Sequence, residues 1–494
     1  GWEDAGSGSS VTFKAFGTGS IMVGDDATGT IDAADNNTGL GVDVFAALTS
    51  GDGNTAVGGI ALDAITTSSD NTAVGHQSLT NATSGVGNTA LGKATMTAVV
   101  TGSNNVAVGR YALSANTSAS NNVAVGVNAL VANTTGASNV AVGESAGYAL
   151  TTGSSNVAIG KNALNAATTV GTQTAIGTDA LKAQHTNGNN TAVGYQAGLT
   201  VTTGAGNDLF GFQCGDKITT GYSNIIYGGF SMDSGADKTG YNNVGIGPSI
   251  MRNMTSGHSN TGAGVRNLED NTTGASNTAI GYESSLNLTT GSSNTAVGVN
   301  SLSSTTTGSG NTCMGNVAGA NISSGSNNLC LGFEAGNAGS PSGDLGTNSN
   351  RIVLGDDAIT NALIRVDWTV TSDKRDKTDI EPLKMGLNFV NKLEPVTYKW
   401  DMRSSYSKDL SITPDGTHKK QKVFGGLLAQ DVEKLEREYG YKVEDETSII
   451  TDKNTDGSYG IAYSKFIPVL INAVQELSTQ VGELKSELLA LKGE

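Results

Sequence analysis

A glycine recurs every 17 residues through most of this chain, and this period limits the folds that the chain can adopt. Twenty copies of the unit end on such a glycine: Gly24, Gly41, Gly58, Gly75, Gly92, Gly109, Gly126, Gly143, Gly160, Gly177, Gly194, Gly211, Gly228, Gly247, Gly264, Gly281, Gly298, Gly315, Gly332 and Gly355. A unit this short cannot enclose a globular core by itself, but stacked units bury one another's apolar faces. We therefore predict a mostly β protein, in which residues 20–355 form a rod, a 17-residue-repeat β-solenoid or β-roll of 20 coils.

The two residues before each glycine predict a short strand with two apolar faces. The residue directly before the glycine is hydrophobic in every copy, as at Val74, and the one before it is most often alanine, as at Ala73. Because side chains alternate along a strand, these positions lie on opposite faces. We expect the larger residue to fill the interior of the coil and the alanine to face a neighbouring chain. Since one coil encloses little volume, we predict several chains side by side, most simply three.

Asparagine lies four residues before the glycine in 17 of the 20 copies, and Gln173 is a conservative exception. Stacked coils are ~4.8 Å apart, a spacing at which side-chain amides can form a ladder of hydrogen bonds. We therefore predict a buried structural ladder of asparagines rather than a ligand site. The glycines are expected at turns with positive φ or at places of tight packing.

The repeat weakens between residues 207 and 264, where the period slips by two residues and aromatic residues gather. Two interpretations stay open. One is a register adjustment or a locally wider rod, and the other is a lateral surface-binding patch. The candidate patch residues are Phe210, Phe212, Tyr222, Tyr227, Phe230 and Tyr241.

Composition divides the chain near residue 371. The residues up to Thr371 include 11 basic and 24 acidic side chains, whereas the last 123 residues include 18 and 21, so the second part is far more densely charged. The net charge of −16 argues against nucleic acid as a partner. The sequence contains no run of 18 apolar residues, so we predict no membrane span. The four histidines have no metal-ligand spacing, and we expect no metal or other cofactor.

Cysteine is too rare in this chain for a disulfide framework, because there are only three. Cys313 and Cys330 stand at the alanine position of adjacent copies. A disulfide between them is within geometric reach, but we expect both to act as small apolar residues.

The end of the chain predicts a helix with coiled-coil spacing over about residues 466–491. Its apolar residues alternate in steps of three and four: Ile467, Leu470, Val474, Leu477, Val481, Leu484, Leu488 and Leu491. Between the rod and this helix, residues 356–371 are expected to form neck strands. Residues 1–19 are expected to be an N-terminal cap or attachment segment. A coiled coil supports the prediction of several chains independently of the rod.

Four motifs in the last part of the chain occur in order. They are Ser-Asp-x-Arg-x-Lys at 372–377, Ala-Gln-Asp-Val at 429–432, Tyr-Ser followed by Ile-Pro at 463–468, and Ala-Val-Gln-Glu-Leu at 473–477. Together they resemble the intramolecular chaperone auto-processing domain that closes many phage tail fibres and endosialidase-type tailspikes. The resemblance covers residues 372–494. The upstream repeat is similar to the head repeats of trimeric adhesins.

This resemblance implies that the domain helps three chains to assemble and then cuts itself off. The scissile bond is then Thr371–Ser372, with Ser372 as nucleophile, Lys377 as general base, and Asp373 and Arg375 in positioning roles. A serine–lysine pair can replace a serine–histidine pair. Lysine must be neutral to accept a proton, so its pKa has to fall from ~10.4 towards 7–8 by burial or by like charges, for which Lys374 and Arg375 are candidates. No turnover enzyme is predicted in the rod.

The sequence thus predicts a trimeric phage tail-fibre or tailspike shaft that belongs to a virion. Its partners would be its own copies, baseplate or tail proteins, and a glycan or protein receptor on a bacterium. A trimeric adhesin of the bacterial cell surface is the alternative. An ice-binding surface formed by threonines such as Thr55, Thr72 and Thr89 is a minor alternative, because we expect these side chains to face inward with the branched residues.

Overall fold

The computed structural model describes residues 12–14, 17–24, 34–186, 188–340, 342–359, 361–365, 371–403, 406, 412–453 and 457–493. Contacts group the chain into two units, residues 1–309 and 310–494. The second unit therefore contains the last strands of the repeat as well as the segment after residue 371, where composition alone placed a boundary.

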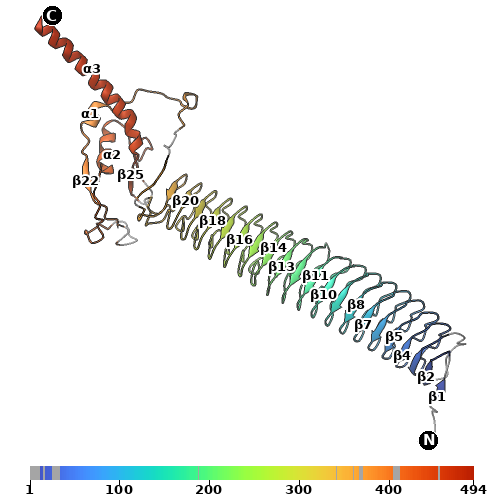
Figure 1. Cartoon of the computed structure of the whole chain (residues 1–494). Coiled ribbons are helices and arrows are strands. Elements are labelled where there is room, and N and C mark those ends of the chain that lie inside the picture. The colour runs from blue at the N-terminus through green and yellow to red at the C-terminus, as the bar shows by residue number, and fades with distance from the viewer. Residues whose placement is uncertain are drawn as a thin grey trace. The chain divides into compact units, whose positions relative to one another are not determined.

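The repeat forms a parallel β-solenoid with one short strand for each coil (Figure 1). In the first unit, a short strand β1 (Thr12–Lys14) pairs antiparallel with β2, and every later strand pairs parallel with the next. The first-unit strands are β2 (Ile21–Gly24), β3 (Thr38–Gly41), β4 (Thr55–Val57), β5 (Thr72–Val74), β6 (Thr89–Leu91), β7 (Val106–Val108), β8 (Val123–Val125), β9 (Val140–Val142), β10 (Val157–Ile159), β11 (Thr174–Ile176), β12 (Thr191–Val193), β13 (Asp208–Phe210), β14 (Ile225–Tyr227), β15 (Val244–Ile246), β16 (Thr261–Ala263), β17 (Thr278–Ile280) and β18 (Thr295–Val297). The second unit continues the pattern with β19 (Thr312–Met314), β20 (Leu329–Leu331) and β21 (Ile352–Leu354). The predicted β-solenoid is confirmed.

The two faces of each strand are the reverse of our prediction. Ala73, in the middle of β5, is fully buried inside the coil, whereas Thr72 and Val74 on either side of it face outward and are partly exposed. The interior is narrow, and a second residue of each coil, such as Leu79, already fills it with a large buried side chain. Only a methyl group fits opposite that side chain. The branched residues before the glycines therefore lie outside, and so do the threonines.

The asparagine ladder is confirmed. In a central coil, the backbone N–H of Asn139 donates to the side-chain oxygen of Asn122 at 2.9 Å, and the side-chain Nδ2 of Asn122 donates to the carbonyl of Gly136 at 3.0 Å. Gln173 keeps part of the pattern, because its Oε1 accepts from the N–H of Asn190 at 3.2 Å. Each buried amide thus pairs backbone groups of the turn that no strand could pair.

The irregular coils differ from the regular ones in their inward side chains. Leu209 replaces the inward alanine of β13, and Gly215 stands where most coils have the large residue opposite it. A Cβ atom on Gly215 would lie 3.0 Å from Leu209 Cδ2. Two coils later, Gly245 takes the inward position of β15, and a Cβ on Gly245 would lie 2.8 Å from the Ile250 side chain. Strand pairing continues through the two-residue slip, with Tyr227 opposite Ile246. The slip thus keeps the register of the strands, as the first of our two interpretations expects, and in the coil of β14 both Ile226 and Met232 are fully buried.

The coil with the two extra residues buries a lysine. Lys238 is fully buried, and its Nζ donates to the carbonyl of Ser234 at 2.5 Å. Burial lowers the pKa of Lys238 from 10.5 to about 8, while the nearby Asp233 and Asp216 oppose that change and Lys217 adds to it. Asp216 is also buried, and burial raises its pKa to about 6.

We expect Lys238→Met to stabilise the rod at pH 7 by about 1–3 kcal/mol, because the buried ammonium costs more than its single hydrogen bond returns. The unfolded chain binds more protons than the folded chain between pH 8 and 10.5, so the wild-type stability should rise across that window and the advantage of the variant should shrink. Thermal unfolding at pH 7 and pH 10 measures both effects. Lys161→Met, at an exposed site, is the control. A Lys238→Met protein less stable than wild type at pH 7 would refute the expectation.

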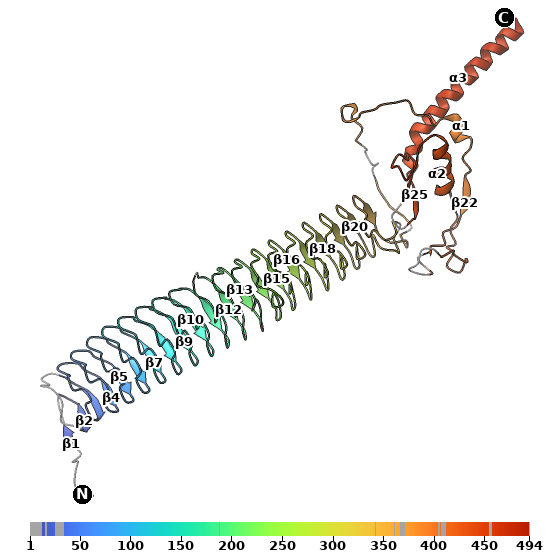
Figure 2. The ribbon, with the colours of Figure 1, turned by 180° about the vertical axis from the view of Figure 1, so that it is seen from behind.

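The rest of the second unit is a small α+β region that ends in a long helix (Figure 2). Its elements are η1 (Lys374–Asp376), α1 (Leu387–Val390), β22 (Val396–Tyr398), β23 (Phe424–Gly426), α2 (Ala429–Glu438), β24 (Thr451–Lys453), β25 (Tyr459–Ile461), η3 (Tyr463–Lys465) and α3 (Phe466–Lys492). Strands β22 and β23 form one antiparallel hairpin-like pair, and β24 and β25 form another. The expected neck strands are not present over 356–359 and 361–365, and residues 366–370 lie outside the described residues.

Helix α3 has one face packed on its own domain and another that no described residue covers. Phe466 and Val469 join the buried core of this region, which also contains Met385, Phe389, Val432 and Ile450. Asn472 Nδ2 donates to the carbonyl of Met385 at 2.9 Å and holds the first half of the helix in place. The apolar residues at the predicted coiled-coil positions are exposed instead. Their exposed fractions range from 42% at Val481 to 85% at Leu491.

Candidate self-cleavage site

The motif at residues 372–377 folds into a single turn of 3-10 helix, η1. Asp373 is its N-cap, and its side chain accepts a hydrogen bond from the backbone N–H of Arg375 at 2.9 Å. The guanidinium of Arg375 then clamps the same carboxylate, with Nη2 2.6 Å from Oδ2. This ion pair lowers the pKa of Asp373. The positioning roles expected for Asp373 and Arg375 thus have a physical form, since both fix the turn that separates the serine from the lysine.

The turn brings the two candidate catalytic side chains together. Lys377 Nζ lies 2.5 Å from Ser372 Oγ, within hydrogen-bond distance. The lysine follows the serine by five residues, so the contact is local and depends on η1 keeping its shape. A neutral amine at this position could take the hydroxyl proton as the oxygen attacks a carbonyl. This hydroxyl belongs to Ser372, the residue on the C-terminal side of the candidate scissile bond Thr371–Ser372.

The site is open to solvent in a single chain. Thr371, Ser372 and Lys377 are all exposed. Arg375, one of the two like charges considered for the lysine, is paired with Asp373, so its charge is largely offset. Nothing among the described neighbours of this turn shields the amine from water, and residues 366–370 on the other side of the scissile bond lie outside the described residues. A single chain therefore holds the reacting pair together at a site that is open to water.

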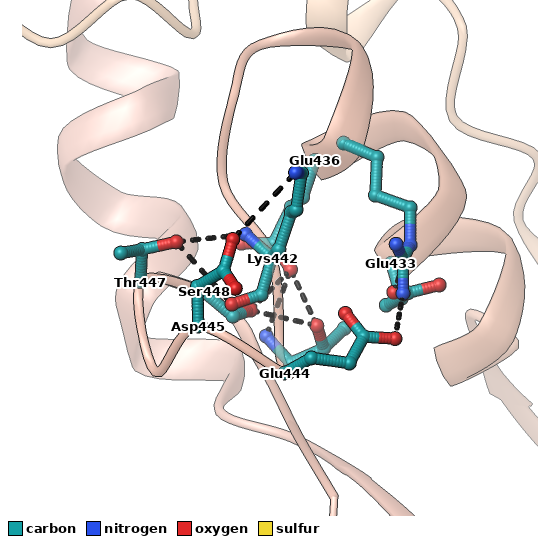
Figure 3. Close-up of polar contacts among 9 residues, drawn as sticks. Glu433, Glu436, Lys442, Glu444, Asp445, Thr447 and Ser448 are labelled. Atoms are coloured by element: carbon teal, nitrogen blue, oxygen red, sulfur yellow. Dashed lines mark hydrogen bonds and ion pairs between the residues drawn. The ribbon is translucent and has the colours of Figure 1, made fainter.

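A buried carboxylate anchors the domain near its centre, and sequence reasoning missed it. Glu436 of α2 is fully buried. It accepts hydrogen bonds from the backbone N–H groups of Ile449, Ile450 and Thr451 at 2.7–3.1 Å, and from the hydroxyl of Ser448 at 2.8 Å. Figure 3 draws the contact of Ser448 with Glu436 and the neighbouring polar contacts between α2 and the loop after it. The available signal was its spacing, because Glu436 lies four residues after Val432, on the buried face of α2.

The six aromatic residues proposed as a patch divide into three separate stacks. Phe210 and Tyr227, directly before their glycines, stack with ring centroids 4.5 Å apart. Phe212 follows its glycine and stacks with Tyr195 at 5.2 Å, and the ring of Phe230 lies at the same distance but is tilted by 56°. Tyr222 and Tyr241 stack at 4.8 Å in the turn before the strand, and His258 extends that row. The structure therefore brings these residues together within rows along the rod rather than in one patch.

The cysteines are buried thiols, and Cys313 and Cys330 are opposite one another on β19 and β20. They stand at the alanine position, which lies inside the coil rather than against another chain, and there they act as small buried residues. Within the described ranges, no three His, Cys, Asp or Glu side chains gather where they could hold a metal ion. None of the helices that the structure describes is long and apolar enough to cross a membrane.

Comparison with known proteins finds similarity at the level of a protein family. Searches of curated proteins and of solved structures found nothing similar to this chain. The match covers the segment that begins at the serine of the turn just described and runs through α2. Residues 372–441 match the model of the family described as chaperone of endosialidase.

Proposed function

We propose that this chain is the subunit of a trimeric fibre, and that its C-terminal domain guides assembly and then cuts itself off before Ser372. The observation that carries the proposal is the chemistry of the outward strand face. The strands β2 to β21 have two outward side chains each, forty in all, and Asp208 is the one charged residue among them in these described strands. Most of the others are Thr, Val, Ile or Leu.

A strand face with almost no charged side chains is unusual for a surface that stays exposed to water. The residues after the glycines also face outward, and they include Lys93, Arg110, Glu144 and Lys161. Charge is therefore tolerated on the rod, yet it is almost missing from the strand rows. Leu91 is 47% exposed in the single chain, and similar side chains repeat in coil after coil. A long apolar surface of this kind is typical of an interface. We therefore place the contact between copies at the Thr and Val rows, where our sequence prediction had placed it at the alanines.

Helix α3 offers a second surface for the same partners. Ile467, Leu470, Ile471 and Val474 line a shallow apolar surface on the side of the helix that faces away from its own core. Their spacing is that of a coiled coil. Copies that join through this helix would also begin the alignment of the rods, which agrees with a chaperone role for the domain.

Cleavage in this scheme waits for assembly. Ser372 Oγ attacks the carbonyl carbon of Thr371 while Lys377 takes the hydroxyl proton. Lys377 then gives this proton to the peptide nitrogen, the C–N bond breaks, and the nitrogen leaves as the amino group of Ser372. Water then hydrolyses the ester and releases residues 372–494. Because the pair is exposed in one chain, neighbouring copies would have to supply the surroundings that keep the lysine neutral.

The resemblance of the domain to those of phage fibres supports a place in a virion, attached to baseplate or tail proteins, with a bacterial glycan or protein as receptor. A trimeric adhesin on a bacterial surface is the alternative with the same architecture. The outward threonines support a second function, ice binding, because our reason for placing them inside was wrong. Four consecutive strands, β7 to β10, replace threonine with valine, which interrupts the row and favours the fibre. Thermal hysteresis of the purified rod tests ice binding directly.

Light scattering of the purified full-length chain tests the fibre. We expect three times the mass of a 50.0 kDa chain, or of its two parts together after cleavage. Val125→Lys with Val142→Lys should abolish the trimer, because each copy would bury two charges in the interface. Thr178→Lys, in the row after the glycines where lysines already occur, is the matched control. A monomeric wild-type protein, or a trimer unaffected by the two valine substitutions, would refute the proposal.

A further inference from the structure

The strand face proposed to join the copies is nearly the same from coil to coil. Thr55 and Val57 on β4 have the same outward side chains as Thr72 and Val74 on β5, and β8 and β9 likewise share a valine pair. If one copy slides along another by one coil, most contacts are therefore replaced by identical ones. An interface of this kind has little power to fix the stagger between chains.

The middle of the rod breaks this uniformity at one level. Phe210 on β13 and Tyr227 on β14 occupy the outward row that Val193 occupies in the coil before and Ile246 in the coil after. The two rings stack at 4.5 Å with an angle of only 3° between their planes, so they form one rigid block. Tyr227 is 43% exposed in the single chain.

The coils beneath this block are built to hold it in place. Leu209 and Ile226, the inward neighbours of the two rings, are fully buried at the position where most coils have alanine. The strands keep their register on both sides, with Val193 opposite Phe210 and Tyr227 opposite Ile246. The block is therefore a fixed projection on an otherwise even surface, at the same height in every copy.

We infer that the stacked pair Phe210–Tyr227 sets the stagger between copies of this chain. The inference rests on the proposed fibre. In register, the projections of all copies meet at one level, and the rods separate slightly only there. In a slipped arrangement, each projection lies against the valines or isoleucine of its neighbour, which pushes the rods apart at several levels and leaves the rows between them unpacked.

The other aromatic stacks do not carry this role. Phe212 and Tyr195 belong to the row after the glycines, where Arg110 and Lys161 stand in other coils, so this row faces solvent. That difference supplies a control on the same coils. It also separates our inference from a receptor patch, which would have no effect on how the copies align.

The test moves the projection in one of two full-length chains. In the moved chain, Ile176→Phe and Val193→Tyr create the pair two coils earlier, while Phe210→Val and Tyr227→Val remove the original. The chain is coexpressed with wild type under different tags, and trimers are separated by tandem affinity capture. In a mixed trimer, the C-terminal domains would align the rods coil by coil. The Phe–Tyr pairs of the two kinds of chain would meet only if one rod were shifted by two coils. We expect mixed trimers about tenfold below the binomial share.

Moved chains expressed alone should form normal trimers, which shows that they fold. A chain with Tyr195→Val and Phe212→Val should mix with wild type at the binomial share. Mixed trimers of moved and wild-type chains at that same share would overturn the inference while leaving the fibre intact. A wild-type chain that is monomeric by light scattering would overturn the proposed fibre itself. If moved and wild-type chains mix at the binomial share, but trimers of the moved chain no longer adsorb to bacterial cells, the rings of Phe210 and Tyr227 are a receptor patch instead.

Discussion

Gly58→Ala should destabilise the rod by about 3 kcal/mol or more. Gly58 has φ of +121°, a conformation that residues with a Cβ rarely adopt. A Cβ atom there would lie 2.7 Å from the carbonyl carbon of Gly75 and 2.9 Å from its oxygen, in the next coil. These are backbone atoms that pair with further coils, so they cannot move away at low cost. Thermal unfolding followed by circular dichroism measures the loss, and hydrogen exchange in β4 and β5 locates it.

Gly59→Ala is the matched control, one residue further along the chain. Its nearest neighbours would be His76 Cδ2 at 3.6 Å and the carbonyl oxygen of Val42 at 3.8 Å, both ordinary contacts, and its backbone does not need a positive φ. We expect a change within about 0.5 kcal/mol. Equal unfolding midpoints for the two variants would show that the glycine series does not keep the coils close.

The period of the glycines was enough to predict the solenoid, because a repeat of 17 residues leaves few other ways to bury apolar side chains. The asparagine ladder also followed from the sequence, since a polar residue repeated at one position must meet its copies in the neighbouring coils. What the period could not decide was which side of the strand lies inside. Ala73 and Val74 are both apolar, and only the large inward Leu79 across the coil determines that the alanine is the one that fits.

The candidate site was predictable to the extent that it is local in sequence. Ser372 and Lys377 are five residues apart, and one capped turn is sufficient to bring them together. Glu436 was not predicted, because its partners at 448–451 follow it through a loop whose path no local pattern specifies. The grouping of the six aromatic residues into three stacks was not predicted either, and their role as a binding patch stays a prediction. Phe210 lies before Gly211 and Phe212 lies after it. Because the chain bends at this glycine, the two rings join different rows along the rod.

Ser372→Ala should abolish release of residues 372–494 from the assembled protein, and Lys377→Met should slow it by about a thousandfold or more. The serine supplies the attacking oxygen, and the lysine lies 2.5 Å from it as the one base of the turn placed to take the proton. Lys377→Arg should not restore cleavage, because a guanidinium stays protonated and cannot act as a base. Denaturing electrophoresis and intact-mass spectrometry of the purified assembly count cut and uncut chains.

Lys374→Met is the matched control for the lysine, because Lys374 lies in the same turn and is equally exposed but makes no contact with Ser372 among the described residues. It should cleave close to the wild-type rate, because the charge of Lys374, which the sequence offered as a candidate influence on Lys377, is exposed to solvent and screened. Asp373→Asn should fall between the two, since it weakens the clamp of Arg375 and loosens the turn without removing either reacting group. Cleavage at the same bond in Ser372→Ala would assign the reaction to another nucleophile. Slow cleavage in Lys374→Met would mean that positive charge near the bond, rather than the Ser372–Lys377 contact, controls the reaction.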